Sequence, residues 1–180
     1  DPTGNLVADA RVPHRTTHMH TGWAEQAPAD WWDGLVRAIA ELHLPQSVLT
    51  RIAAIGVAAT SSTVVFATAD GEPVRPAMLW MDVRATVEAK EIERTGHPVL
   101  ALCPDGVSPE WGPAKTAWVS KHEPDLFTAT DVVCEGGDWL IHQLTGEWSA
   151  NVPAAATAWF FDAVNSRWPD DLYCASGLTG

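Results

Sequence analysis

The sequence has little of what marks a secreted or membrane-spanning protein. Its 180 residues contain three cysteines, Cys103, Cys134 and Cys174, which are widely spaced and form no CxxC pair. An odd and sparse set of this kind indicates reduced thiols in an intracellular, cytoplasmic protein and argues against a disulfide framework. No apolar run approaches the roughly 20 residues that a membrane-spanning helix needs. These scarcities exclude a disulfide-stapled domain and a transmembrane segment.

Basic residues are also scarce. Lysine and arginine number 11 against 23 aspartates and glutamates, which gives a formal net charge of −12. Such a surplus of negative charge repels phosphodiester backbones and anionic lipid, so roles in nucleic-acid binding or at a membrane surface are disfavoured. The remainder is 46% hydrophobic and includes ten tryptophans, which fits a packed globule of one domain, or of one domain and part of another.

The N-terminus has neither a methionine nor a signal-peptide layout, and residues 1–5 form a turn signal, as if the chain starts in mid-fold. Apolar periodicity and turn residues then predict a series of alternating elements. Strands are expected at 6–17, 52–59, 64–66, 76–80 and 131–134, and helices at 28–43, 84–95, from 113 to before Pro124, 139–144 and from 168 onward. Strands interleaved with helices predict an α/β domain.

The stretch from Ile52 to Phe66 is the centre of the predicted sheet. It begins as a short apolar run rich in β-branched residues, breaks into Thr60, Ser61, Ser62 and Thr63, and resumes as a second apolar strand. A buried strand that ends in small hydroxyl residues is a common ligand position in α/β proteins, because these groups leave room and both donate and accept hydrogen bonds. The alternative is a Ser/Thr turn that joins two strands.

Three histidines fall on one face of the predicted first strand. His14, His18 and His20 share that face at a period of two, so a zinc site is one interpretation. The spacing is loose and no cysteine or carboxylate is fixed beside them, so a solvated strand edge is the preferred interpretation, and no metal site is predicted.

Several short motifs, occurring in a fixed order over roughly residues 5–170, carry a family resemblance. They are Gly22 with Gln26-Ala27-Pro28 and Trp31-Trp32; Ile55-Gly56-Val57; Asp70-Gly71-Glu72-Pro73; Leu79-Trp80-Met81-Asp82-Val83-Arg84; Pro113-Ala114-Lys115-Thr116-Ala117-Trp118 with His122-Glu123-Pro124; and Asp138-Trp139-Leu140 with Leu144-Thr145-Gly146-Glu147. Together they resemble the N-terminal domain of the FGGY carbohydrate kinases. Within that family, the loop at 59–65 and the segment at 107–115 resemble the ribulokinase-type, or pentulose kinase-like, branch.

The resemblance implies a ribonuclease-H-like (actin-like ATPase) fold, with a mixed sheet flanked by helices. It also implies that residues 1–180 are a partial N-terminal, sugar-binding domain, truncated at both ends. The family's leading strand hairpin with its Asp-x-Gly-Thr motif, its catalytic aspartate and its C-terminal ATP-binding domain are not expected in this chain. ATP and Mg²⁺ would serve the full-length protein, and neither is expected to bind this fragment. The exposed sheet edge is compatible with a homodimer.

The same resemblance, weighed with side-chain chemistry, predicts the substrate-binding residues. A polyol needs hydrogen-bond donors and acceptors at fixed spacing, and the hydroxyl groups of Thr60, Ser61 and Ser62, here called the hydroxyl corner, can supply them. The indole of Trp80 can lie against the carbon side of a sugar. Lys115 is expected in the first turn of a helix, where the helix dipole disfavours a cation, so a sugar or phosphate contact would explain it. Asp82 and Arg84 are expected to pair and shape the wall. The predicted set is Thr60, Ser61, Ser62, Trp80, Asp82, Arg84, Glu110, Trp111 and Lys115.

The predicted function is ATP-dependent phosphorylation of a pentulose or related polyol, with this chain as the sugar-binding part and inactive alone. No catalytic residue is predicted within it. A non-catalytic carbohydrate-binding or actin-like structural module is the alternative. A ribonuclease-H-like nuclease is disfavoured, because it needs several acids around two metals and must bind a polyanion.

Overall fold

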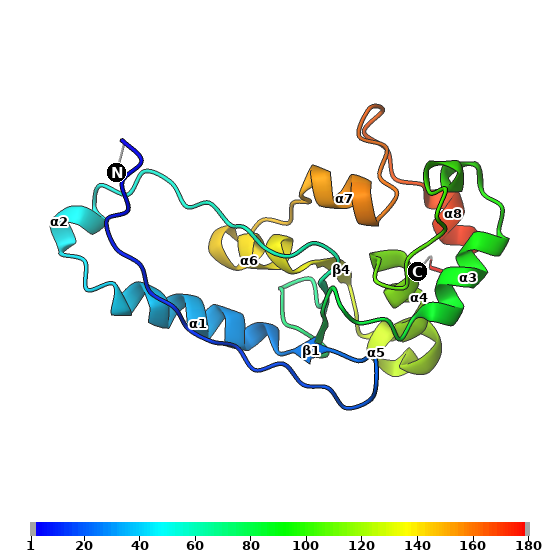
Figure 1. Cartoon of the computed structure of the whole chain (residues 1–180), viewed down its shortest axis with the longest axis horizontal. Coiled ribbons are helices and arrows are strands. Elements are labelled where there is room, and N and C mark those ends of the chain that lie inside the picture. Colours follow the sequence, from blue (N-terminus) through cyan, green and yellow to red (C-terminus); the bar gives the residue numbers. More distant parts are fainter. Residues whose placement is uncertain (1–2, 179–180) are drawn as a thin grey trace.

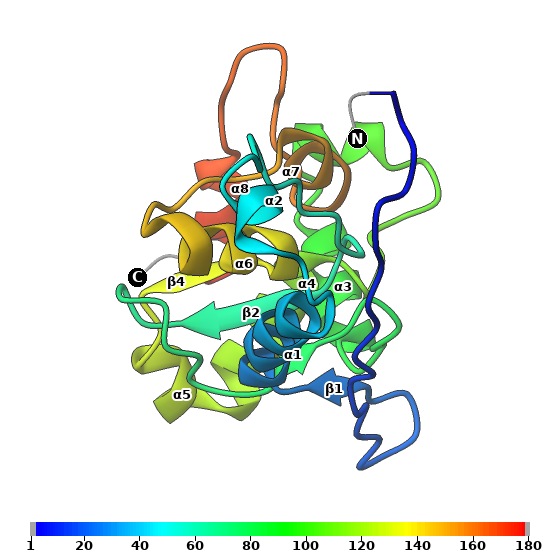
Figure 2. The ribbon, with the colours of Figure 1, turned by 90° about the vertical axis from the view of Figure 1, so that its left-hand side faces the viewer.

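The computed structural model describes residues 3–178, apart from the side chain of Leu102 (Figures 1 and 2). In chain order, the elements are β1 (Glu25–Gln26), α1 (Pro28–Glu41), α2 (Gln46–Leu49), β2 (Val64–Ala67), β3 (Ala77–Met78), α3 (Thr86–Arg94), the 3₁₀ helix η1 (Pro98–Leu102), α4 (Gly112–His122), α5 (Pro124–Thr128), β4 (Val132–Glu135), α6 (Gly136–Thr145), α7 (Val152–Ala158) and α8 (Asp170–Ala175).

The described strands form one sheet in the order β1-β3-β2-β4, and each neighbouring pair is antiparallel. β2 and β4 pair along their whole length, from Val64 opposite Glu135 to Ala67 opposite Val132. All four residues of β2 are buried. A continuous apolar run is what a strand covered on both faces requires, and the predicted strand at 64–66 is therefore confirmed.

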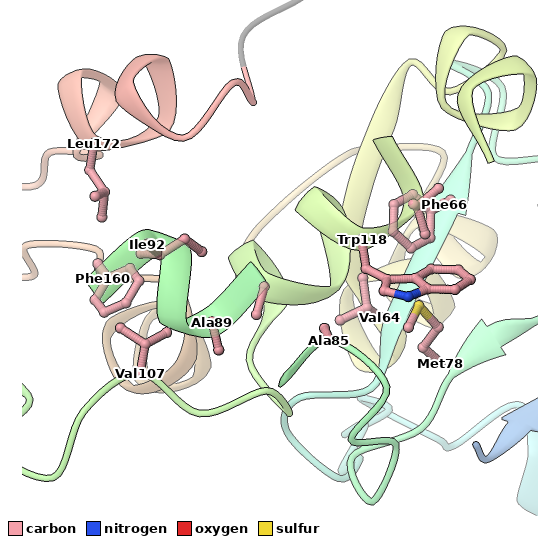
Figure 3. Packing of buried hydrophobic residues seen from close by; sticks show 12 residues of the cluster. Val64, Phe66, Met78, Ala85, Ala89, Ile92, Val107, Trp118, Phe160 and Leu172 are labelled. Atoms are coloured by element: carbon pink, nitrogen blue, oxygen red, sulfur yellow. The ribbon is translucent and has the colours of Figure 1, made fainter. Parts of the chain in front are cut away.

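The two faces of β2 pack against different parts of the molecule. Val64 and Phe66 join the larger core cluster, which extends through Trp118 of α4 and Ile92 of α3 to Leu172 of α8 (Figure 3). Val65 and Ala67, which point the opposite way, pack with Trp139 of α6 in the second cluster. The alternation of side chains along one four-residue strand thus ties α4 to one face of the sheet and α6 to the other.

Two of the predicted strands are wrong. Residues 6–16 and 51–60 have no regular secondary structure, and most of them are exposed, including Ile55 at 62%. Residue 17 makes an isolated antiparallel bridge with Glu25. The apolar, β-branched composition favours a strand, but a strand exists only where a neighbour takes up its backbone hydrogen bonds, and residues 3–178 offer these segments no such neighbour. The pairing within the described sheet is accordingly antiparallel, not mixed.

The helices follow the sequence signals more closely. α1 begins at Pro28 as predicted, and α4 ends at His122, before Pro124 as predicted, although a short helix that was not predicted, α5, begins at Pro124 itself. α6 ends at Thr145, and its C-cap, Gly146, has a φ of +75°. Of the residues of α1 only Pro28 and Gly34 are buried, and Trp31 and Trp32 are partly buried against the second core cluster. The N-terminal segment runs alongside this helix (Figure 1), and a Cβ placed at Gly34 would come within 2.6 Å of His14 Cε1. No helix within residues 3–178 is long and apolar enough to cross a membrane.

Candidate functional site

A turn of small hydroxyl residues precedes β2. Thr60 and Ser61 are exposed, and Ser62 has a left-handed backbone with a φ of +65°. A non-glycine residue in this region is uncommon and persists where its surroundings hold it. The turn is therefore present, but it does not join two strands as the alternative had it, because residues 52–60 form no strand. Whether this corner also binds a ligand depends on what surrounds it.

The buried side chain of Lys115 contacts the backbone of this hydroxyl corner. Its side chain is fully buried in the first turn of α4, and its Nζ donates hydrogen bonds of 2.7 Å to the carbonyl oxygens of Ser62 and Leu79. Two main-chain acceptors explain why a cation lies where the helix dipole disfavours it. Lys115 thereby joins the hydroxyl corner to the segment that carries Trp80.

The charge of Lys115 is set by its environment. Burial lowers the pKa of Lys115 to about 8, and neighbouring carboxylates oppose this lowering. The carboxylates are those of Asp82, Glu135 and Glu110. At neutral pH the group is therefore still a cation, and it compensates buried negative charge around the corner.

Asp82 and Arg84 hold the other end of this segment. The Asp82 carboxylate is fully buried, accepts a 2.7 Å hydrogen bond from the Ala24 amide, and lies 2.6 Å from an Arg84 guanidinium nitrogen. The same guanidinium is 2.8 Å from Glu25 and stacks 3.6 Å from the Trp23 ring centroid. These contacts make the pair a structural support of the loop, as its expected pairing implied.

Trp80 lies beside the corner in an open cavity of about 580 Å³, here called the aromatic cavity. The Trp80 side chain is 45% exposed. Thr60, Thr63, Gln26 and Trp31 also line this cavity. A partly exposed indole and hydroxyl groups thus line the same cavity, and a mostly apolar lining with a few polar groups is typical of a small-molecule site.

A second cavity of 460 Å³, here called the polar cavity, lies on the other side of the corner. Thr60 and Ser61 line it together with Glu135, Asp138 and Asn151. Glu135 and Asp138 are 5% and 7% exposed, and burial raises the pKa of each carboxyl group. Neither carboxylate belongs to the predicted set, although a glutamate that ends an apolar strand before Gly136-Gly137 is a detectable signal.

The predicted site residues fall into three groups. Thr60 lines both cavities, Ser61 lines the polar cavity, and Trp80 lines the aromatic cavity. The second group lines neither cavity and makes structural contacts: Lys115 with the carbonyl oxygens of Ser62 and Leu79, and Asp82 with Arg84. Glu110 and Trp111 line neither cavity; Trp111 packs edge-on against Phe160, with ring centroids 5.5 Å apart.

The three histidines do not converge. His18 Nδ1 lies 2.7 Å from the Trp23 carbonyl oxygen, His20 packs edge-on against Trp23, and His14 lies against Gly34. Within residues 3–178, no group of three or more histidine, cysteine, aspartate or glutamate side chains is arranged to hold a metal ion.

Glu135→Gln is expected to fold at neutral pH at least as stably as the wild type. The folded-state pKa of Glu135 is raised above its unfolded value, so its stabilising contribution is present at low pH and is lost as the pH rises through the folded pKa. Glutamine does not titrate, so the relative stability of the variant should increase with pH. Urea unfolding between pH 4 and 8 measures this, with Glu147→Gln, an exposed carboxylate, as the control. An advantage for the variant that falls with rising pH would contradict it.

Comparison with known proteins places this arrangement in a family. A model of the FGGY family of carbohydrate kinases, N-terminal domain, matches residues 1–180. The xylulose kinase of Escherichia coli strain K12 is 28% identical over 176 residues, covering 98% of this chain and 36% of that protein. The xylulose kinase of Streptomyces coelicolor is 36% identical over 148 residues, covering 81% of this chain and 30% of that protein.

Solved structures agree. A xyloylose kinase from Brucella ovis matches with a TM-score of 0.85 at 30% identity, covering 99% of this chain and 37% of that one. The Plasmodium falciparum glycerol kinase with ADP matches with a TM-score of 0.82 at 20% identity, covering 98% and 37%, and supports the fold alone. The chain thus spans about a third of the length of these relatives, and the expected actin-like ATPase fold class is confirmed. It belongs to the FGGY family of carbohydrate kinases, whose N-terminal domain it matches.

Proposed function

We propose that this chain is the sugar-binding part of a kinase that transfers the γ-phosphate of ATP to a hydroxyl of a pentulose or related polyol. The observation that carries the proposal is the hydroxyl corner at Thr60 and Ser61, which opens into a cavity on either side. A polyol presents hydroxyls on one side and carbon atoms on the other. Hydroxyl and carboxylate groups in one cavity and an exposed indole in the other match both features.

The contribution of these residues to such a reaction is positioning. Phosphoryl transfer depends on holding the acceptor hydroxyl in line with the phosphate, on charge neutralisation, and on a carboxylate that takes the hydroxyl proton. Lys115 donates one 2.7 Å hydrogen bond to the Ser62 carbonyl oxygen of the corner and another to the Leu79 carbonyl oxygen beside Trp80, so it fixes the two segments relative to each other. ATP and Mg²⁺ are proposed to serve the full-length protein.

Calorimetric titration and a turnover assay test this function. The chain is titrated with ribulose, xylulose, ribitol and glycerol, and the full-length gene product is assayed for ATP turnover with the same compounds. We expect a sugar-specific binding heat and sugar-dependent ATP turnover by the full-length product. ATP turnover by the 180 residues alone would contradict the proposal that this chain binds the sugar but does not catalyse phosphoryl transfer by itself. Sugar binding without turnover by the full-length product would instead favour the non-catalytic carbohydrate-binding module.

Ser61→Trp is expected to weaken sugar binding by the full-length gene product about 100-fold or more, because a bulky side chain at the corner obstructs the polar cavity and removes a hydroxyl. Ser61 is exposed, so the fold should be unaffected. The measurement is KM or Kd for the preferred sugar, with circular dichroism to verify folding. Ser47→Trp on α2 places the same bulk on an exposed serine outside both cavities and should leave the affinity unchanged. Unchanged affinity in folded Ser61→Trp would remove Ser61 from the site.

A further inference from the structure

The Asp138 carboxylate has one oxygen that no residue of the described chain uses. Asp138 lies in the first turn of α6, is 7% exposed, and lines both the polar cavity and an adjoining hollow of 260 Å³. Its Oδ1 accepts a 2.9 Å hydrogen bond from the Asn151 amide. Its Oδ2 makes no hydrogen bond with any residue of 3–178, and it is not one of the side-chain atoms there that are both fully buried and unpartnered. Oδ2 therefore keeps accessible surface that a ligand can reach.

Two structural roles explain why a carboxylate lies at this position, but not its free oxygen. The helix dipole favours a negative charge in the first turn of α6, and Oδ1 ties α6 to Asn151, the N-cap of α7. The anchoring role needs only one oxygen. Burial raises the pKa of Asp138, because the nearly buried charge loses hydration. A second hydrogen bond, made by a ligand at Oδ2, would offset this cost.

The hydroxyl groups that share the polar cavity with Asp138 are also free. Thr60, Ser61 and Ser149 line this cavity, and their hydroxyl groups make no hydrogen bond within residues 3–178. Each hydroxyl can both donate and accept. Ile141 adds apolar wall, and the volume of 460 Å³ falls within the usual range for small-molecule sites. The cavity thus combines one fixed acceptor with groups that adapt to either role.

These groups select the chemical class of the ligand. An anion would meet the carboxylates of Asp138 and Glu135, which line the same cavity. A hard metal ion needs several oxygen ligands, and residues 3–178 gather no group of three or more histidine, cysteine, aspartate or glutamate side chains around a common point. A hydroxyl group donates to a carboxylate oxygen without adding charge, and the free hydroxyls nearby can complete the hydrogen bonds of a polyol.

We propose that the polar cavity binds hydroxyl groups of the polyol and that Asp138 is a specificity-determining residue, accepting a hydrogen bond from one substrate hydroxyl at Oδ2. This inference rests on the proposed function and names the group that selects its substrate. A nearly buried carboxylate rejects an analogue that lacks the matching hydroxyl, because its oxygen would lose water without gaining a partner. Asp138 therefore distinguishes a polyol from its deoxy analogue at one carbon.

Asp138→Asn separates this role from a purely structural one. Asparagine keeps an oxygen that accepts from the Asn151 amide and replaces the free acceptor with an NH₂ group. In the full-length gene product, we expect KM for the preferred compound among ribulose, xylulose, ribitol and glycerol to rise about 10- to 100-fold, with KM for ATP unchanged.

Monodeoxy analogues of that preferred compound give a second readout. With one of them, kcat/KM of the wild type should fall about tenfold or more, and the same analogue should cost Asp138→Asn little further. A structural role would not change this ratio, because a distorted cavity weakens the parent compound and its analogue alike. Equal analogue losses in the wild type and in folded Asp138→Asn would overturn the assignment while leaving the kinase proposal intact.

The matched control is Asp131→Asn. The Asp131 carboxylate also accepts a backbone hydrogen bond, at 2.9 Å from the Ala69 amide, but Asp131 is exposed and lines neither cavity. This variant should therefore change neither KM nor the analogue ratio.

If Asp138→Asn does not fold, Thr157→Phe fills the same cavity from α7, where Thr157 is exposed. It should raise KM for the polyol about tenfold or more. A folded Thr157→Phe with wild-type KM would overturn the assignment, because the polyol would then not occupy the polar cavity. Absence of any polyol phosphorylation by the wild type would instead overturn the proposed function itself.

Discussion

Lys115→Met is expected to destabilise the folded protein by about 3–5 kcal/mol. Methionine preserves most of the buried volume, so the loss is electrostatic. The carbonyl oxygens of Ser62 and Leu79 lose a donor in a buried environment, and the charge that opposes Asp82 and Glu135 disappears. Urea unfolding followed by tryptophan fluorescence measures the free energy of unfolding.

Lys121→Met is the matched control for that variant. Lys121 lies on the same helix, α4, with about half of its side chain exposed, and it pairs with Glu91 at the surface. Removing such a pair should cost at most about 1 kcal/mol. Equal losses of unfolding free energy in the two variants would show that the buried hydrogen bonds of Lys115 contribute no more than an exposed ion pair. The claim that Lys115 holds the hydroxyl corner in place would then be wrong.

The pKa of Lys115 adds a second readout to the same pair of variants. Its folded-state pKa is lowered to about 8 from 10.5, so the unfolded chain binds a proton more strongly between these values. Stability from this group therefore rises as the pH increases from about 8 to about 10.5, by up to about 3 kcal/mol. The difference in stability between Lys121→Met and Lys115→Met should widen over this range. A constant difference would mean that Lys115 is not desolvated.

The sequence predicted those helix ends and strands that are set by nearby residues, such as a proline, a glycine or a short apolar run. Pro28 starts a helix, the helix before Pro124 ends at His122, Gly146 caps another helix, and a short apolar run becomes the buried β2, whereas the short helix α5 that begins at Pro124 was not predicted. The strands predicted at 6–17 and 52–59 are wrong for a reason that is not local. Their composition is that of strands, but a strand also requires a partner, and composition carries no information about whether one is present.

The candidate site divides in the same way. Thr60, Ser61 and Trp80 could be named from the sequence because each follows an apolar run and belongs to a motif that resembles a known family. Lys115 could be flagged as an anomaly in a first helical turn, but its carbonyl partners lie 53 and 36 residues away in the chain. Glu135 joins the corner because β4 pairs with β2, which places it opposite Val64. Contacts of this kind depend on sheet register, which a single sequence does not reveal.

Arg84→Met is expected to destabilise the protein by about 3–5 kcal/mol, because it leaves the fully buried Asp82 carboxylate without its guanidinium partner. Arg84→Lys keeps the charge but loses the forked hydrogen bonds and the stacking on Trp23, so it should also be destabilising, though less so. Chemical unfolding of the single variants, of Asp82→Asn and of the double variant Asp82→Asn/Arg84→Met measures the coupling.

The double variant decides whether this pair acts as a unit. Once Asp82 is neutral, removal of Arg84 no longer strands a buried charge, so the double variant should be more stable than the sum of the two single losses predicts, by about 1–3 kcal/mol. Arg94→Met, on the exposed last turn of α3, should change stability by no more than about 1 kcal/mol. Additive losses would mean that Asp82 and Arg84 are independently satisfied. The loop that carries Trp80 would then be held without a coupled ion pair, by the hydrogen bond from Lys115 to the Leu79 carbonyl oxygen and by the backbone hydrogen bonds of Leu79 to Ala24 and of Val83 to Gly22.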